Sequence, residues 1–130
     1  MTYREIFKSA VALIAEDVNG DTIADYEDRA LYILATFCNQ TAAIDARYRT
    51  ANGCIPSAWI GASTVNMNAI FALHEVFVPV AAYYLASALV LDENEEMSEH
   101  LFALYTDAIA SIVASLPCST APVTDAYGLI

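Results

Sequence analysis

The sequence predicts an all-α protein: a small bundle of about four helices, with an extended non-helical arm between the second and third helices and an extended C-terminal tail. Apolar residues recur at helical spacing over four segments, at about residues 2–16, 22–50, 73–91 and 96–115. Clusters of Gly, Asn, Asp and Pro separate these segments. The helical period is lost between the second and third segments, over more than twenty residues.

The first helix is expected at residues 2–16, and the Asp-Val-Asn-Gly-Asp turn at residues 17–21 ends it. The second helix is expected to begin with Asp21 or Thr22 as its N-cap and to end near residue 50, with acids in its first turns and arginines in its last. An apolar stripe follows this helix for more than six turns, so we expect it to be the spine of the bundle. The stripe consists of Tyr26, Ala30, Ile33, Phe37, Ile44 and Tyr48.

Residues 51 to about 72 form the predicted arm. Turn signals (Asn-Gly, Pro-Ser and Gly-Ala-Ser) alternate there with short strand-like pieces, at residues 54–55, 59–60 and 65–67. The segment is long for a plain connector in a small domain. We therefore expect an extended arm or a small hairpin that contacts another surface.

The third helix is expected to run to Leu91 and to start either near Leu73 or at Pro79, where proline fits a first turn. It is apolar on all sides, which predicts complete burial. In a bundle of four short helices, we expect part of that cover to come from outside the chain. The fourth helix follows the acidic turn at residues 92–96 and ends before Pro117.

Composition predicts one helical domain over residues 1–116, followed by a peptide tail over residues 117–130. Hydrophobic residues make up 58% of the chain and charged residues 16%, against about 25% charged in ordinary soluble domains, so we expect other chains to cover part of the surface. The uncharged stretch at residues 76–91 is too short to span a bilayer and has acidic flanks, which predicts no membrane segment. The predicted interaction residues are Ile55, Trp59, Ile60, Tyr83, Tyr127, Leu129 and Ile130.

Net charge narrows the class of partner. The chain carries a formal charge of −11, and all five of its lysines and arginines lie before residue 50. Between Thr50 and Ile130 there are eight acids and no lysine or arginine. Proteins that grip nucleic acids neutralise phosphates with these bases, so tight DNA or RNA binding is not expected. An acidic surface would instead let DNA pass without sticking.

One acidic run matches part of a calcium-binding loop. Residues at positions 1, 3, 5, 9 and 12 of that template are Asp17, Asn19, Asp21, Asp25 and Asp28. The template glycine at position 6 and the glutamate at position 12 are missing, and helix capping explains the same acids. Capping is the preferred interpretation, and a calcium-dependent module is kept as a weaker alternative.

No catalytic, cofactor or metal site is predicted elsewhere, and the chain is not expected to be an enzyme. His74 lacks the second histidine of a zinc-protease motif, because Val78 stands four positions later. Glu96 and His100 predict a surface pair, and Cys38 predicts a buried thiol. The N-terminus has no secretory signal pattern and the cysteines form no metal or disulfide motif, so we expect reduced cytosolic thiols: Cys38, Cys54 and Cys118.

The order of these parts resembles a known family. A short helix and an acidic turn precede DYEDRALYILATF (residues 25–37), and a non-helical arm leads to FVPVAAYYLASALVLDENEEMSEHLFALYTDAIASI (residues 77–112). This is similar to the small helical head–tail connector (adaptor) proteins of tailed bacteriophages, over roughly residues 3–116. In those proteins an aromatic and proline-containing segment leads into an Ala-Tyr-Leu-Ala helix, an acidic turn and a helix with Leu-x-x-x-Tyr. The family has no catalytic residues to carry over.

The resemblance implies a ring of about a dozen copies beneath the portal protein, which extends the DNA channel and offers a platform for tail or stopper proteins. It places the chain at the head–tail junction of the virion, and in the host cytoplasm during assembly. Residues 51–70 and 117–130 would then contact neighbouring subunits and the portal. The lack of bases after Arg49 argues against phosphate steering there. The alternative from the residues alone is an acidic cytosolic helical regulator or inhibitor, of the DNA-mimic or antitoxin kind.

Overall fold

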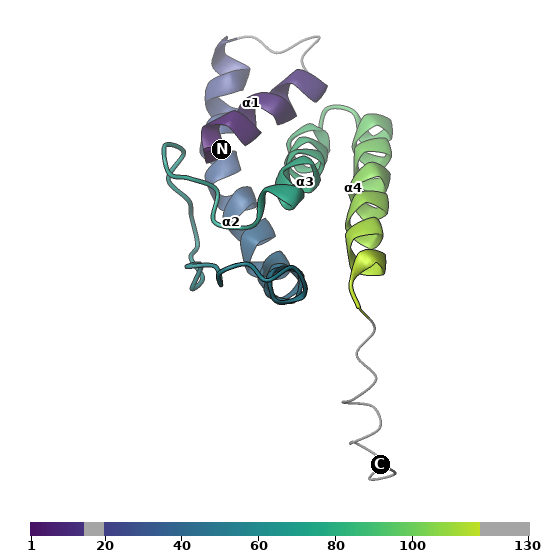
Figure 1. The fold of residues 1–130 in the computed structure, drawn as a ribbon. Helices are drawn as coiled ribbons and strands as arrows, with labels where there is room; N and C mark the ends of the chain where they lie inside the picture. Colours follow the sequence, from purple (N-terminus) through teal and green to yellow (C-terminus); the bar gives the residue numbers. More distant parts are fainter. Residues whose placement is uncertain (15–19, 118–130) are drawn as a thin grey trace, which may run out of the picture.

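The computed structural model describes residues 1–14 and 20–117, and within them the chain forms four α-helices and no strand (Figure 1). The elements are α1 (Tyr3–Leu13), α2 (Gly20–Ala51), the short 3-10 helix η2 (Glu75–Phe77), α3 (Val78–Val90) and α4 (Glu95–Ser115). The predicted all-α bundle with a long arm between its second and third helices is confirmed. The expected tail lies outside the described residues, apart from Pro117.

α1 begins where the sequence supplies a cap. The Thr2 hydroxyl accepts a hydrogen bond from the Glu5 amide at 3.3 Å, and the Glu5 carboxylate accepts one from the Thr2 amide at 3.4 Å. The first N–H groups of the helix have no partner inside it. Tyr3 donates its amide to the Ala69 carbonyl at 3.1 Å, and the following amide donates to the Met67 carbonyl at 2.9 Å. The arm therefore completes the N-terminal cap of α1.

α2 begins at Gly20, two residues before Thr22, which would be the first helical residue after an Asp21 cap. Asp21 and Thr22 consequently lie inside its first turn, and the prediction that one of them is the N-cap is wrong. Aspartate is favoured both at the cap and in the first turn, next to the positive end of the helix dipole. The presence of Asp21 therefore does not decide between a helix that starts before it and one that starts after it. The helix ends at Ala51 with Arg49 in its last turn, close to the predicted end.

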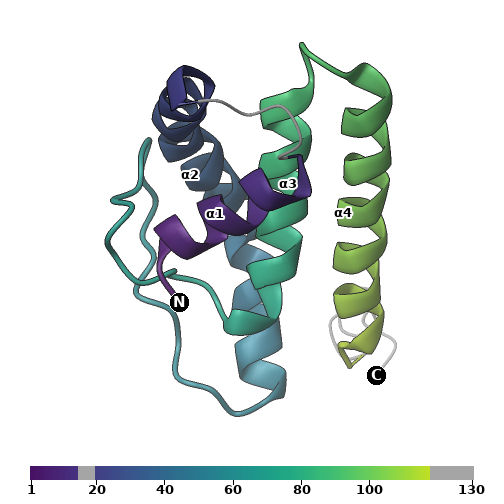
Figure 2. The ribbon, with the colours of Figure 1, turned by 90° about the horizontal axis from the view of Figure 1, so that it is seen from above.

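α3 is the central helix. It lies between α4 on one side and α1 and α2 on the other (Figure 2), and eight of its thirteen residues are buried. The prediction that α2 is the spine is wrong, because α4 packs mainly against α3 and hardly against α2. The other helices leave part of α3 uncovered, since Pro79 is exposed and Tyr84 and Ala88 are only half-buried, so the expectation that another chain covers part of α3 stays a prediction. Its start at Val78, with Pro79 in the first turn, agrees with the second of the two predicted starts.

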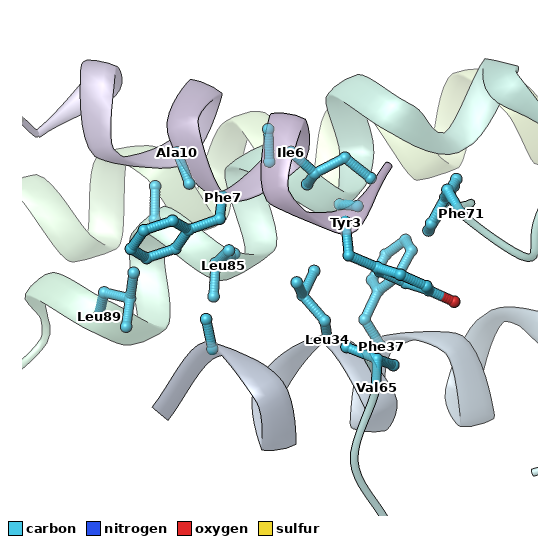
Figure 3. Packing of buried hydrophobic residues seen from close by; sticks show 14 of the residues in the cluster. Tyr3, Ile6, Phe7, Ala10, Leu34, Phe37, Val65, Phe71, Leu85 and Leu89 are labelled. Carbon is cyan, nitrogen blue, oxygen red and sulfur yellow. The ribbon is translucent and has the colours of Figure 1, made fainter. Parts of the chain in front are cut away.

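The core forms where the four α-helices, η2 and the arm meet, and Figure 3 shows the part between α1, α2, α3 and the arm. α1 contributes one face of apolar side chains, which lies over side chains of α2 and α3, and the arm closes the end beside Tyr3. Removing this apolar surface from water is the main force that holds the elements together. The labelled members are Tyr3, Ile6, Phe7, Ala10, Leu34, Phe37, Val65, Phe71, Leu85 and Leu89.

The arm, residues 52–74, runs along the side of the bundle opposite α4 (Figures 1 and 2). The strand-like pieces expected in it do not form strands: its one ladder contact is an isolated bridge between Thr2 and Ile70. The bridge replaces a hairpin because the arm pairs with the start of α1 and not with itself. Val65 and Met67 are buried, so the surface that the arm contacts belongs to its own chain.

α4 follows a capped acidic turn, as predicted. The Asn94 side chain accepts a hydrogen bond from the Met97 amide at 3.0 Å, and Glu95 and Glu96 lie in the first turn. The helix ends at Ser115, two residues before Pro117. Among the helices that the structure describes, none is long and apolar enough to cross a membrane.

Candidate functional site

The last turns of α2 hold both ends of the arm. The Arg49 guanidinium donates to the Asp45 carboxylate at 2.9 Å, to the Ile55 carbonyl at 2.8 Å and to the Ala72 carbonyl at 3.4 Å. Asp45 is 1% exposed, and its second oxygen accepts the His74 amide at 2.7 Å. One buried ion pair therefore joins residue 55 at the start of the arm to residues 72 and 74 at its end. Sequence analysis gave Asp45 no role.

The middle of the arm is attached to α2 as well. The Asn39 side chain donates to the Ala62 carbonyl at 2.8 Å and accepts from the Trp59 indole N–H at 3.1 Å. Further along, the Val65 amide donates to the Leu31 carbonyl at 3.2 Å. Hydrogen bonds of this kind along the length of the segment define its position on the bundle.

Two large aliphatic side chains of this attached arm face solvent. Ile55 is 82% exposed and Ile60 is 96% exposed. Ile60 precedes Gly61, whose φ of 98° is a conformation that glycine adopts without strain. The arm thus presents isoleucines outward from a backbone that the rest of the chain holds in place.

The other predicted interaction residues lie elsewhere. Trp59 and Tyr83 are half-buried and pack against the core, so neither is fully displayed. The indole of Trp59 helps to hold the arm on α2. The remaining three lie outside the described residues: Tyr127, Leu129 and Ile130.

A second surface feature, which sequence analysis missed, is an apolar groove between α3 and α4. Its volume is about 580 Å³, within the usual range of binding pockets. Leu91 is 54% exposed and Phe102 is 50% exposed at its edges. The lining residues are Tyr84, Ser87, Ala88, Leu91, Ser98, Glu99, Phe102 and Ala103. On α3 the lining residues at 84, 87, 88 and 91 keep helical spacing, a signal that is equally typical of a core stripe.

Small residues account for the hollow between the two helices. Ser87 donates its hydroxyl to the Ser98 carbonyl at 3.0 Å, and the Ser98 hydroxyl donates to the Ser87 carbonyl at 2.8 Å. These reciprocal bonds hold α3 and α4 close together at buried serines. Ala88 and Ala103 beside them are too short to fill the space above. The groove therefore has a fixed floor and does not depend on a mobile loop.

Aromatic rings connect the groove to the core. The ring of Phe102 lies 5.3 Å from that of Tyr105, which lies 5.1 Å from that of Tyr84, and Tyr84 lies 5.5 Å from Phe37. Such offset and edge-on pairs add to the stability from burial alone. Burial raises the pKa of the Tyr84 and Tyr105 hydroxyls, so both stay neutral over the physiological range.

The buried thiol of Cys38 is not a reactive site. Its sulfur lies 3.7 Å from the Tyr3 hydroxyl, inside the core. Burial raises the pKa of the Cys38 thiol to about 11, so the nucleophilic thiolate is scarce near neutral pH. The prediction of a buried thiol is confirmed. Cys54 is partly exposed in the arm, and Cys118 lies outside the described residues.

This difference predicts selective alkylation. At about pH 8, iodoacetamide should modify Cys38 about 100-fold more slowly in the folded chain than in urea, because burial raises the pKa of this thiol to about 11 and so lowers its thiolate fraction. Peptide mass spectrometry resolves each site, and Cys54 in the same sample is the internal control. Equal labelling of Cys38 in the folded and unfolded chains would show that the core opens readily.

The remaining candidates from the sequence are His74, the Glu96–His100 pair and the calcium-loop template. His74 caps η2, since its Nδ1 accepts the Val76 amide at 3.1 Å. Glu96 and His100 are both exposed on α4. Because α2 is helical from Gly20 onward, the second half of the calcium template does not form a loop, while its first half lies partly outside the described residues. Within residues 1–14 and 20–117, no three His, Cys, Asp or Glu side chains form a metal cluster.

The fold and these surfaces define a small helical domain whose arm is held against its own bundle and whose α3–α4 face carries an apolar groove. Comparison with known proteins adds no relative: no family model, no curated protein and no solved structure matches the chain.

Proposed function

We propose that this chain is a structural subunit that works by contacting copies of itself, as a head–tail connector (adaptor) of a tailed bacteriophage. In this role it forms a ring beneath the portal protein, extends the DNA channel and offers a docking platform to tail or stopper proteins. The proposal rests on the family resemblance of the sequence together with surface features that a self-contained monomer does not need.

The observation that carries the proposal is the outward display of Ile55 and Ile60 on a backbone that Arg49 and Asn39 hold in place. A flexible loop would lose conformational entropy on binding, whereas an arm that is already ordered loses less. Because the arm and α4 lie on opposite sides of the bundle (Figure 2), a contact through the arm leaves the α4 side free for a different neighbour. Subunits joined through two unlike faces form rings or filaments.

Charge agrees with a channel that DNA crosses without being held. The whole segment from Thr50 onward contains no lysine or arginine, and Asp92, Glu95, Glu96 and Glu99 are exposed around the start of α4. Acidic surfaces repel the phosphate backbone. The same charge supports the second candidate, an acidic helical regulator or inhibitor that mimics DNA or neutralises a toxin. Portal and capsid genes beside its gene would favour the connector, and a toxin or nuclease gene would favour the regulator.

The proposal predicts that Ile60→Asp reduces self-association without unfolding the chain. A charge placed where an apolar contact forms should weaken that contact at least about ten-fold, since each ten-fold step corresponds to about 1.4 kcal/mol. Light scattering over rising concentration measures the mass, and negative-stain images show whether the particles are rings. Because Ile60 is almost fully exposed, the melting temperature should not change.

Ser9→Asp, which adds the same charge at an exposed position on α1, outside both the arm and α4, is the matched control. The parent chain should give masses that are multiples of 14.1 kDa. A chain that stays single at every concentration, with Ile60→Asp indistinguishable from the parent, would contradict the connector and favour the regulator.

A further inference from the structure

We infer that the groove between α3 and α4 binds a basic amphipathic helix, with apolar side chains in the groove and lysines or arginines facing its acidic rim. This inference goes beyond the proposed function and does not depend on ring formation. It concerns the α4 side of the bundle, whereas Ile60 lies on the arm.

The shape and lining of the groove fit an apolar anchor. Leu91 on the α3 side and Phe102 on the α4 side are both half-exposed, and the serine pair below keeps the two helices together. An amphipathic helix places side chains at i, i+3, i+4 and i+7 into a groove of this kind. Half-exposed large apolar residues on each wall of a preformed hollow are typical of interaction sites in otherwise soluble proteins.

The charge around the groove selects the partner. Glu99 lines it, and Asp92 and Glu95 are exposed at the end near Leu91. Asp107 lies one helical turn beyond Ala103 on the same stripe of α4 and is also exposed. No lysine or arginine occurs from residue 50 onward, so α3 and α4 carry none themselves. Arg29 of α2 donates to the Ala88 carbonyl at 3.2 Å and offsets only part of this acidic charge. A partner with positive charge beside its apolar face gains electrostatic attraction, and an acidic partner is repelled.

Neither a second groove nor the end of this chain has the required charge. Two grooves face to face would bring acids against acids. The segment after residue 117 carries Asp125 and no base. Three of the five bases of the chain already bind its own carboxylates: Arg4 to Glu27, Arg29 to Asp25 and Arg49 to Asp45. A separate basic helix therefore fits the groove better than any segment of this chain.

The test uses the full chain and a synthetic amphipathic peptide with leucines at i, i+3, i+4 and i+7 and lysines elsewhere. Titration calorimetry should show one-to-one binding of this peptide and none of a peptide with glutamate at each lysine position. Phe102→Asp and Leu91→Asp should each weaken binding at least about ten-fold, although both add negative charge. Far-UV circular dichroism confirms that each variant is folded.

Matched variants separate the two contributions. Glu95→Gln combined with Glu99→Gln should weaken binding about three-fold and make it less sensitive to salt, because exposed charges contribute modestly and are screened. Ile60→Asp, on the arm, should leave peptide affinity unchanged. If the proposed ring does not form but the peptide binds as described, the groove inference stands and only the connector fails.

Four results would overturn the inference. The first is that the lysine peptide does not bind, and the second is that the glutamate peptide binds equally well. The third is that Phe102→Asp and Leu91→Asp bind the lysine peptide as tightly as the parent, which means that attraction by net charge is sufficient. The fourth is that Phe102→Asp abolishes self-association of the chain, which makes a second copy the occupant.

Discussion

Phe37→Ala is expected to lower the free energy of unfolding by about 4 kcal/mol, because it removes a large buried ring and leaves a cavity. Phe37 is 0% exposed and joins three parts of the molecule. Its ring lies 6.5 Å from that of Phe71 in the arm, 5.5 Å from Tyr84 in α3 and 6.4 Å from Tyr105 in α4. A loss of this size is a large fraction of the stability of a small domain.

Urea unfolding followed by circular dichroism measures the loss. Phe37→Leu keeps most of the volume, so it should lose clearly less than the alanine variant. Since Phe37 contacts the arm, α3 and α4 at once, the arm and the helices should unfold together in one transition. A loss below about 1 kcal/mol for Phe37→Ala would mean that the ring is not at the centre of the core.

Asp45→Ala is expected to lower the free energy of unfolding by about 3 kcal/mol, since it leaves a largely buried guanidinium and a backbone amide without their acceptor. The partners that lose it are Arg49, at 2.9 Å, and the His74 amide, at 2.7 Å. The melting temperature should fall by about 10 °C for a chain of this length. Hydrogen exchange should rise first in the arm, because the ion pair joins its two ends.

Conservative variants separate the charge from the hydrogen bond. Asp45→Asn keeps an oxygen that can accept the His74 amide and loses the charge that attracts Arg49, so its loss should be intermediate. In a double-mutant cycle with Arg49→Ala, the two losses should be clearly less than additive. Asp107→Ala, an exposed acid on α4, is the control and should change stability by less than about 0.5 kcal/mol. Additive losses would show that the pair does not hold the arm.

Local signals along the chain predicted most of the secondary structure. The acidic turn before α4, Pro79 in the first turn of α3 and Arg49 in the last turn of α2 all depend on residues within a few positions of one another. Such interactions act the same way wherever the helix is finally packed. The helix locations and the irregular arm can therefore be predicted from the sequence without the tertiary structure.

The candidate sites were only partly predictable. Ile55, Ile60 and Trp59 were all predicted to be interaction residues; the two isoleucines are exposed, whereas Trp59 is half-buried on α2. A tryptophan in an arm contributes apolar area to any surface it meets, and the sequence does not say which. The groove was missed because two helices form it together. A small residue such as Ser87 in one helix does not by itself indicate a hollow beside it.

The one-dimensional pattern was thus sufficient to determine that this protein is helical, acidic after its first 49 residues and interrupted by a long arm. Tertiary packing alone decided that α3 lies at the centre, that the arm caps α1 and that Asp45 is buried. The physical reason is the range of the interactions. Caps and dipoles act within a turn or two of the chain, whereas burial depends on which distant segments share the same apolar surface.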